Sequence, residues 1–161
     1  MANYADEIEI TLLPDNMVRV ADNGRGIPVD KHPKAKVSAL EVILTTLHAG
    51  GKFGGEGKGY VVSGGLHGVG ASVVNALSTN TVAEVHKDGD KYRQEYAVGK
   101  KKTAVKKVGK TKHNGTVIMF RPDEEIFKDI EFDFKRVVTH MRQQAYLVKG
   151  LQISVLDARE S

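Results

Sequence analysis

The placement of glycine constrains this chain more than any other feature of its sequence. Ten of its 17 glycines lie between Gly50 and Gly70, and a helical pattern stands on either side of that stretch. A segment of this composition has few side chains to bury, whereas its backbone N–H groups are open to a ligand. We interpret residues 50–65 as a mobile lid in which Lys52 supplies a point charge for a terminal phosphate.

The length and composition predict one globular domain over residues 1–161. Hydrophobic residues make up 40% of the chain and charged residues 27%, the balance of a folded protein. No apolar run reaches the ~20 residues of a membrane-spanning helix, and the N-terminus shows no signal-peptide pattern. The chain has no cysteine, which excludes disulfides and thiolate metal sites. We therefore expect no membrane contact and a cytoplasmic location.

Strand and helix patterns alternate along the chain and predict an α/β or α+β sandwich in which helices back a mixed sheet. Ile8, Ile10 and Leu12 alternate with polar residues, as in a half-buried strand. A turn at residues 14–16 and a strand from Met17 complete a hairpin. Further strands are expected over 82–86, 92–98, 116–120 and 151–155, and helices over 38–47, 71–77 and 134–148. The first helix is expected to bury Leu40, Ile43, Leu44 and Leu47, and the second Val69, Val73, Val74 and Leu77.

Positive charge is concentrated in one segment. Seven lysines and no acidic residue lie between Lys100 and Lys112, whereas the whole chain has a net charge of +4. The rest of the chain therefore carries about −3, since these seven charges exceed the total. Charge runs are usually exposed, so we interpret residues 100–112 as a solvated loop. Contact with nucleic-acid phosphates is the alternative.

The segment from Asp22 to Pro28 is the first candidate binding motif. Its carboxylate follows an apolar run, accepts hydrogen bonds and cannot donate them, so Asp22 suits an exocyclic amine such as that of adenine. Gly24 and Gly26 would let the backbone approach a planar ligand. An ordinary Asp-Asn-Gly turn remains the alternative when the segment is considered alone.

The second candidate motif runs from Gly64 to Gly70 and leads directly into a helix. Exposed backbone N–H groups beside a helix N-terminus favour phosphate binding. A flexible glycine hinge is the alternative when this segment is considered alone. The order Gly-x-x-Gly-x-Gly is not the dinucleotide fingerprint, and no Walker A sequence is present. The histidines near the two motifs, His48 and His67, could be read as a metal pair, but their glycine context favours lid and loop positions.

Together, three segments resemble the GHKL ATPase domain of the B subunits of bacterial type II DNA topoisomerases. They are Asp22–Pro28, His48–Phe53 and Ser63–Ser78, and the similarity continues through Tyr92–Gln94 and Gly115–Val117 to Lys149–Leu151. The resemblance covers nearly the whole chain, and it favours DNA gyrase over topoisomerase IV. It implies the Bergerat ATP-binding fold, also found in MutL, histidine kinases and a large heat-shock chaperone.

The resemblance implies a role for particular residues. Asp22 resembles the aspartate that binds the adenine amine, and Thr116 the threonine that shares a bound water with it. Lys52 would lie near the γ-phosphate. The remaining candidate ATP-binding residues are Gly24, Arg25, Gly26, Ile27, Pro28 and Ile43 around the base, and Gly65, Leu66, His67, Gly68, Val69, Gly70 and Ala71 around the phosphates. Ile43 as ordinary core and Thr116 as an ordinary strand residue remain alternatives.

The chain also departs from the family pattern at both ends. Family members carry a helix before the first strand, with a glutamate that activates water and an asparagine that binds Mg²⁺, and a transducer domain after the last strand. These 161 residues contain no counterpart of either, and Glu7 and Glu9 alternate out of the buried face of their strand. We therefore expect a domain lacking that helix and the transducer, with no catalytic base and no metal ligand of its own.

What the resemblance implies for the whole protein is an ATP-dependent, Mg²⁺-dependent topoisomerase. Its partners would be ATP, DNA, the topoisomerase A subunit and a second copy of the B subunit. Two alternatives come from other classes. One is a nucleotide-free module that binds DNA through residues 100–112, and the other is a GHKL kinase. The hairpin after the second helix and the His48–Phe53 segment argue against the kinase.

Overall fold

The computed structural model describes residues 5–31, 36–47 and 69–160. Its elements are β1 (Glu7–Leu13), the 3-10 helix η1 (Pro14–Asn16), β2 (Met17–Asp22), α1 (Ala39–Thr45), α2 (Gly70–Ala76), β3 (Ser78–Lys87), β4 (Asp90–Ala97), β5 (Lys100–Lys101), β6 (Lys106–Lys110), β7 (Gly115–Pro122), α3 (Phe134–Leu147) and β8 (Gln152–Asp157). These elements match the expected series in order and type, apart from β5 and β6.

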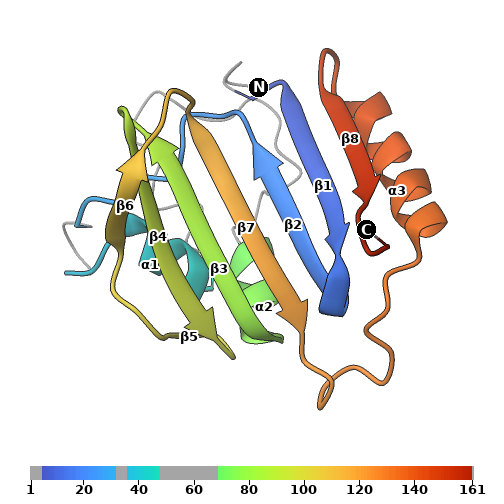
Figure 1. Ribbon diagram of the computed structural model, residues 1–161, viewed down its shortest axis with the longest axis horizontal. Helices are drawn as coiled ribbons and strands as arrows, with labels where there is room; N and C mark the ends of the chain where they lie inside the picture. Colours follow the sequence, from blue (N-terminus) through green and yellow to red (C-terminus); the bar gives the residue numbers. More distant parts are fainter. Residues whose placement is uncertain (1–4, 32–35, 48–68, 161) are drawn as a thin grey trace.

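One mixed sheet of eight strands runs through the described residues (Figure 1). Its order is β5-β4-β3-β7-β2-β1-β8, and β6 also pairs with β4. Only the β1–β8 pair is parallel, and its register places Ile8 opposite Ile153. The other pairs are antiparallel, including the β1–β2 hairpin in which Ile10 faces Val20.

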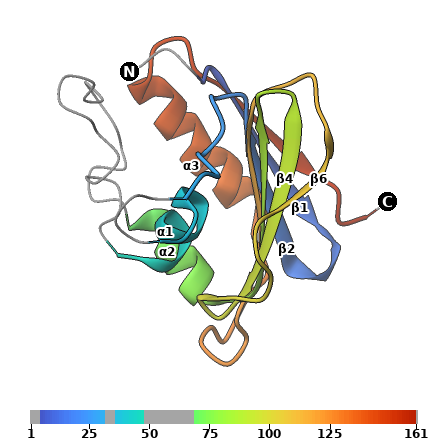
Figure 2. The same ribbon diagram turned by 90° about the vertical axis from the view of Figure 1, so that its left-hand side faces the viewer.

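All three helices lie on the same face of the sheet, so the described chain has two layers (Figure 2). The expected two-layer α/β sandwich with a mixed sheet is confirmed. Register places Ile8, Ile10 and Leu12 on the helix side together with Val18, Val20 and Asp22 of β2. Glu7 and Glu9 alternate to the opposite face, as expected. None of the helices described is long and apolar enough to cross a membrane.

The apolar core consists of two clusters beneath different helices. The first joins Leu40 and Leu44 of α1 to Ala83, Val85 and Tyr96 of β3 and β4, all at most 1% exposed. The second joins buried side chains of the first hairpin to α3; its members include Ile10, Leu12, Val18, Phe120, Phe132, Phe134, Val137, Met141 and Ile153. Each cluster stabilises the fold in proportion to the apolar area that it removes from water.

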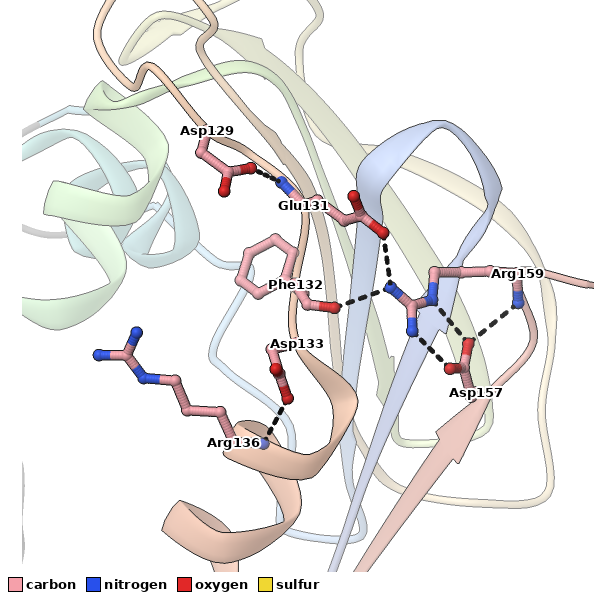
Figure 3. Close-up of polar contacts among 7 residues, drawn as sticks. All are labelled: Asp129, Glu131, Phe132, Asp133, Arg136, Asp157 and Arg159. Carbon is pink, nitrogen blue, oxygen red and sulfur yellow. Dashed lines mark hydrogen bonds and ion pairs between the residues drawn. The ribbon is translucent and has the colours of Figure 1, made fainter.

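Polar contacts connect the start of α3 to the end of β8 (Figure 3). The guanidinium of Arg159 donates to the carbonyl oxygen of Phe132 at 2.7 Å and to the carboxylate of Asp157 at 2.5 and 2.8 Å. Asp133 caps α3, since its side chain accepts a 2.8 Å hydrogen bond from the backbone N–H of Arg136. The loop before α3 is thereby fastened to the edge strand.

The capping residue expected for the first helix is confirmed, but the extent of that helix is not. Ser38 accepts a 3.1 Å hydrogen bond from the backbone N–H of Glu41. The helix ends at Thr45, and Leu47, expected on its buried face, is 60% exposed. The helical spacing of apolar residues therefore continues to Leu47, although the helix ends before it.

The buried face of α2 also differs from the expectation. Ser72 and Asn75 are its buried residues, whereas Val73 is 39% exposed. Asn75 joins α2 to α1 by a hydrogen bond rather than by an apolar contact: its side-chain amide donates to the main-chain oxygen of Leu44. The periodicity of apolar residues identifies the buried face of a helix only where that face is apolar, so it misses a buried face that makes polar contacts.

The lysine segment is not the expected loop. Lys100–Lys101 and Lys106–Lys110 form strands β5 and β6, and both pair with β4 at the edge of the sheet. All five residues of β6 are exposed to solvent, as expected. The expected irregular loop conformation is wrong, because the backbone forms strands. Lysine has low strand propensity, and the pairing with β4 overrides it.

Candidate functional site

Asp22 lies at the end of β2 and points to the helix side of the sheet. One carboxylate oxygen, Oδ1, accepts two backbone hydrogen bonds, from Gly24 at 2.8 Å and from Thr116 at 3.2 Å. The first closes the turn two residues ahead, and the second connects β2 to β7. Both hydrogen bonds of this half-buried side chain fall on Oδ1, so Oδ2 has no partner among the described residues.

Thr116 holds the loop that follows Asp22. The threonine is 6% exposed, and its Oγ1 accepts a 3.2 Å hydrogen bond from the backbone N–H of Ile27. Ile27 in turn packs against the cluster of Leu40, Leu44 and Val85. The structure thus places Asp22, Thr116 and the 23–28 loop side by side.

Glycine is required at two places where the loop meets the sheet. Gly26 has φ +75°, and a Cβ there would lie 2.7 Å from the carbonyl oxygen of His86. At Gly115 a Cβ would lie 2.0 Å from the carbonyl oxygen of Asp22. Real Cβ atoms do not approach backbone oxygens this closely, so both glycines permit the close contact between the loop and strands β3 and β7.

The other candidates around the base lie at the rim of this arrangement. Arg25 and Pro28 are exposed, and Ile43 is half-buried on α1. The carbonyl oxygen of Arg25 accepts a 3.5 Å hydrogen bond from Lys87 Nζ. Ile43 shares its helix with Leu40 and Leu44, which connect α1 to Ile27 through the first core cluster.

The described part of the phosphate candidates is the start of α2. Val69 precedes this seven-residue helix without a side-chain cap, and Gly70 and Ala71 are exposed in its first turn. Lys52, Gly65, Leu66, His67 and Gly68 lie outside the described residues, as does His48.

Three further residues shape the site, and none of them was assigned a role at the sequence level. Asn23 Oδ1 accepts hydrogen bonds from the backbone N–H groups of Asp6 and Glu7, both at 3.1 Å. Gly115 allows β7 to pass Asp22, and Asn75 connects α2 to α1. The Asp-Asn-Gly pattern is a local signal that could have identified Asn23. The roles of Gly115 and Asn75 depend on contacts with distant segments, which no local pattern indicates.

No metal cluster is found in the described part of the chain. Over residues 5–31, 36–47 and 69–160, no three His, Cys, Asp or Glu side chains are placed to hold an ion. Around Asp22, the carboxylate and the hydroxyl of Thr116 accept hydrogen bonds from the backbone N–H groups of Gly24, Thr116 and Ile27.

A mixed sheet covered on one face by three helices (Figure 2), with the carboxylate of Asp22 on the covered face, defines a two-layer α/β domain. Residues 1–126 match the family described as "Histidine kinase-, DNA gyrase B-, and HSP90-like ATPase". The match covers more than half of the chain, and the chain belongs to this family.

Within this family, the chain is similar to DNA gyrase B proteins. The chain is 52% identical to the DNA gyrase B protein of Thermotoga maritima over 157 residues, which is 98% of the chain and 24% of the relative. It is 49% identical to the DNA gyrase B protein of Streptomyces coelicolor over 161 residues, 100% of the chain and 23% of the relative. The chain therefore spans about a quarter of the length of these relatives.

A solved structure agrees with this similarity. The crystal structure of the 43K ATPase domain of Thermus thermophilus gyrase B, in complex with an aminocoumarin, superposes with a TM-score of 0.84 at 40% identity. The match covers 99% of this chain and 39% of that one. The expected family and the expected GHKL fold are both confirmed, and these relatives are gyrase B proteins rather than topoisomerase IV proteins.

Proposed function

We propose that this chain is the adenine-binding part of a DNA gyrase B ATPase domain. The observation that carries the proposal is the fixed carboxylate of Asp22, whose Oδ1 is held by two backbone N–H groups while Oδ2 has no partner among the described residues. An acceptor with one oxygen already engaged can receive the exocyclic amine of adenine on the other. Pre-orientation of this kind reduces the entropy lost on binding.

The surrounding residues support a planar ligand beside Asp22. The backbone at Gly26 approaches β3 closely, and Ile27 presents an apolar side chain on the same loop. Pro28, Arg25 and Ile43 would complete the rim of the base pocket. Val69, Gly70 and Ala71 would approach the phosphates with Gly65, Leu66, His67, Gly68 and Lys52, as the family resemblance implies.

The wider function proposed is that of the B protein of DNA gyrase. The similar proteins carry that name, which favours gyrase over topoisomerase IV. ATP binding and hydrolysis would then drive DNA strand passage together with the topoisomerase A subunit and a second copy of the B protein. Mg²⁺ would accompany ATP in the complete protein, and no described residue is assigned to it.

Binding and hydrolysis are expected to separate in this chain. Glu9 is paired with Arg19, with which it shares the face of the sheet opposite the helices, and Glu7 alternates onto that same face. Both carboxylates therefore lie on the face of the sheet opposite to the one that the Asp22 side chain shares with Ile8 and Ile10. No carboxylate among the described residues is assigned as a general base, and such a base commonly contributes ~10²–10⁴-fold to the rate, so we propose nucleotide binding without measurable turnover.

Calorimetric titration of Asp22→Asn tests the proposal. The asparagine oxygen can keep both backbone hydrogen bonds, while its NH₂ group replaces Oδ2 and presents a donor to the donor amine of adenine. A hydrogen bond to a charged group is worth ~1.5–3 kcal/mol, so affinity for ADP or an adenine-site gyrase inhibitor should fall by about tenfold or more. Asp30→Asn, at an exposed carboxylate, is the matched control and should bind like the parent.

Two outcomes would contradict the proposal. Equal affinity of Asp22→Asn and the parent would remove Asp22 from the adenine site. Phosphate release from Mg²⁺-ATP above the rate without protein would show that this chain contains a catalytic base. In that case Glu56→Gln, which alters the acidic residue within the glycine-rich segment, would show whether that residue is the base.

A further inference from the structure

The edge of the sheet formed by β4, β5 and β6, together with the adjoining end of β3, carries an excess of positive charge. Residues 84–113 contain ten Lys or Arg residues and four Asp or Glu residues, a net charge of +6 with histidine neutral. Because the whole chain carries +4, the remaining residues carry −2. In Figure 1 this edge lies on the opposite side of the sheet from β8. This segment therefore has an excess of positive charge, whereas the remaining residues taken together have an excess of negative charge.

Three lysines at this edge are engaged in holding the strands together. Lys101 contacts Glu41 of α1 at 3.0 Å, and Lys107 and Lys110 contact Asp90 of β4 at 2.7 and 2.8 Å. Hydrogen bonds from Lys107 and Lys110 hold the pKa of Asp90 below its usual range, so this carboxylate remains charged between the two lysines. These three lysines therefore neutralise the carboxylates of Glu41 and Asp90.

Four more lysines have no such role. Lys100, Lys102, Lys106 and Lys112 are exposed and make no ion pair within the part of the chain that the structure describes. We call these four residues the basic edge. Lys106 lies opposite Arg93 in the β4–β6 register, and Arg93 is itself paired with Glu84 and Glu95. Lysines without an ion pair that gather at one edge of the sheet favour an anionic partner.

The dimensions of the edge fit an extended polyanion. β4 has eight residues, and at ~3.4 Å per residue its length is roughly 27 Å. A DNA duplex carries one charge per ~1.7 Å of its axis, so a duplex lying along this edge would present about sixteen phosphates. Each lysine acts as a point charge that needs no particular base sequence.

A protein partner fits this edge less well. Protein interfaces depend on buried aromatic or arginine anchors, and the exposed large apolar side chains described between residues 84 and 113 are only Val98 and Val108. Lysines on an edge strand also discourage pairing with another sheet, which is the competing structural explanation. That explanation predicts no affinity for DNA.

We propose that the basic edge binds the phosphate backbone of double-stranded DNA without base specificity. Fluorescence anisotropy of a labelled 30-base-pair duplex, titrated with this chain between 50 and 200 mM salt, tests it. For four phosphate contacts the slope of log K against log salt is about −3.6, so affinity should fall roughly a hundredfold across this range. Replacing Lys100, Lys102, Lys106 and Lys112 with glutamine should abolish the salt-dependent binding.

The control variant places the same loss of charge on and around α3. It replaces Lys128, Lys135, Arg142 and Lys149, all exposed, with glutamine and should bind DNA like the parent. Circular-dichroism melting verifies that both variants fold. Equal loss of DNA affinity in both variants would overturn the proposal, because binding would then depend only on the net charge of the chain. If the parent does not bind DNA at 50 mM salt, the proposal is also wrong, and the lysines serve only to discourage pairing with another sheet. Tighter binding of polyglutamate than of DNA would overturn the choice of partner.

This inference is independent of the proposed nucleotide function. Asp22→Asn should retain full DNA affinity, and the four-lysine variant should retain adenine-site binding. Failure of one proposal is therefore distinguishable from failure of the other.

Discussion

The side-chain amide of Asn75 in α2 donates a 2.8 Å hydrogen bond to the main-chain oxygen of Leu44 in α1. Asn75 is fully buried, and its own main-chain oxygen accepts a 3.0 Å hydrogen bond from Gly99. One residue thus connects two helices that stand on either side of residues 48–68 in the sequence and also joins them to the loop before β5.

Asn75→Ala should destabilise the domain. The substitution leaves the buried Leu44 carbonyl without its donor, and an unsatisfied buried group costs ~1–3 kcal/mol. Urea denaturation should show a decrease in the free energy of unfolding of about this size. Asn114→Ala makes the same truncation at an exposed position and should change the free energy little. Equal effects of the two substitutions would mean that the helix–helix hydrogen bond contributes nothing measurable.

Gly26→Ala should destabilise the domain more than Gly89→Ala. Both glycines have positive φ, +75° and +82°, so both substitutions carry the backbone cost of ~1–2 kcal/mol. Only at Gly26 would the new methyl group meet a backbone oxygen, whereas nothing lies within 4 Å at Gly89. Thermal melting of the two variants separates the steric cost from the conformational one. Equal melting temperatures would show that the loop moves away from β3 without penalty.

Arg159→Gln should raise the pKa of Asp157. The side-chain hydrogen bond from Arg159 is the main reason that the pKa of this carboxyl lies below its ordinary value. A depressed carboxyl pKa gives stability that is present above the ordinary pKa and lost as pH falls through the lowered one. NMR titration of the Asp157 carboxyl should show the change, with Arg142→Gln as the control on α3. An unchanged Asp157 titration would contradict the contact drawn in Figure 3.

Acidification below neutral pH should weaken the fold through His86. Burial, and secondarily the charge of Lys91, holds the pKa of His86 below 6.5, although Glu84 opposes this shift. The unfolded chain therefore binds a proton at a higher pH than the folded chain does, so the contribution of His86 to stability falls as pH drops below about 6.5. NMR titration should place the midpoint of His86 below 6.5, and Lys91→Gln should raise it.

Regularities within short segments were predictable, and contacts between distant segments were not. The alternation of Ile8, Ile10 and Leu12 predicted β1 because a half-buried strand repeats every two residues. The Ser38–Glu41 pattern predicted the start of α1 for a similarly local reason. By contrast, the lysine-rich strands β5 and β6 depend on pairing with β4, which their own composition does not encode.

The site divides in the same way. Asp22 could be selected from its chemistry and from its position at the end of a strand, and Thr116 followed from the family resemblance. Gly115 could not be selected, because its necessity lies in the carbonyl oxygen of Asp22, which only the folded sheet brings next to it. The polar buried face of α2 was missed because Asn75 forms a hydrogen bond to another helix.

The single parallel pair in the described sheet has a consequence for synthesis of the chain on the ribosome. Strand β1 is completed early, but its parallel neighbour β8 and the covering helix α3 are encoded more than a hundred codons later. At 5–20 residues per second, Ile10 and Leu12 wait on the order of ten seconds for the apolar surface that buries them. During that interval β1 presents an unpaired, partly apolar edge to other nascent chains. The risk of misassembly is therefore greatest before α3 and β8 emerge, and slower translation ahead of residue 134 would prolong it.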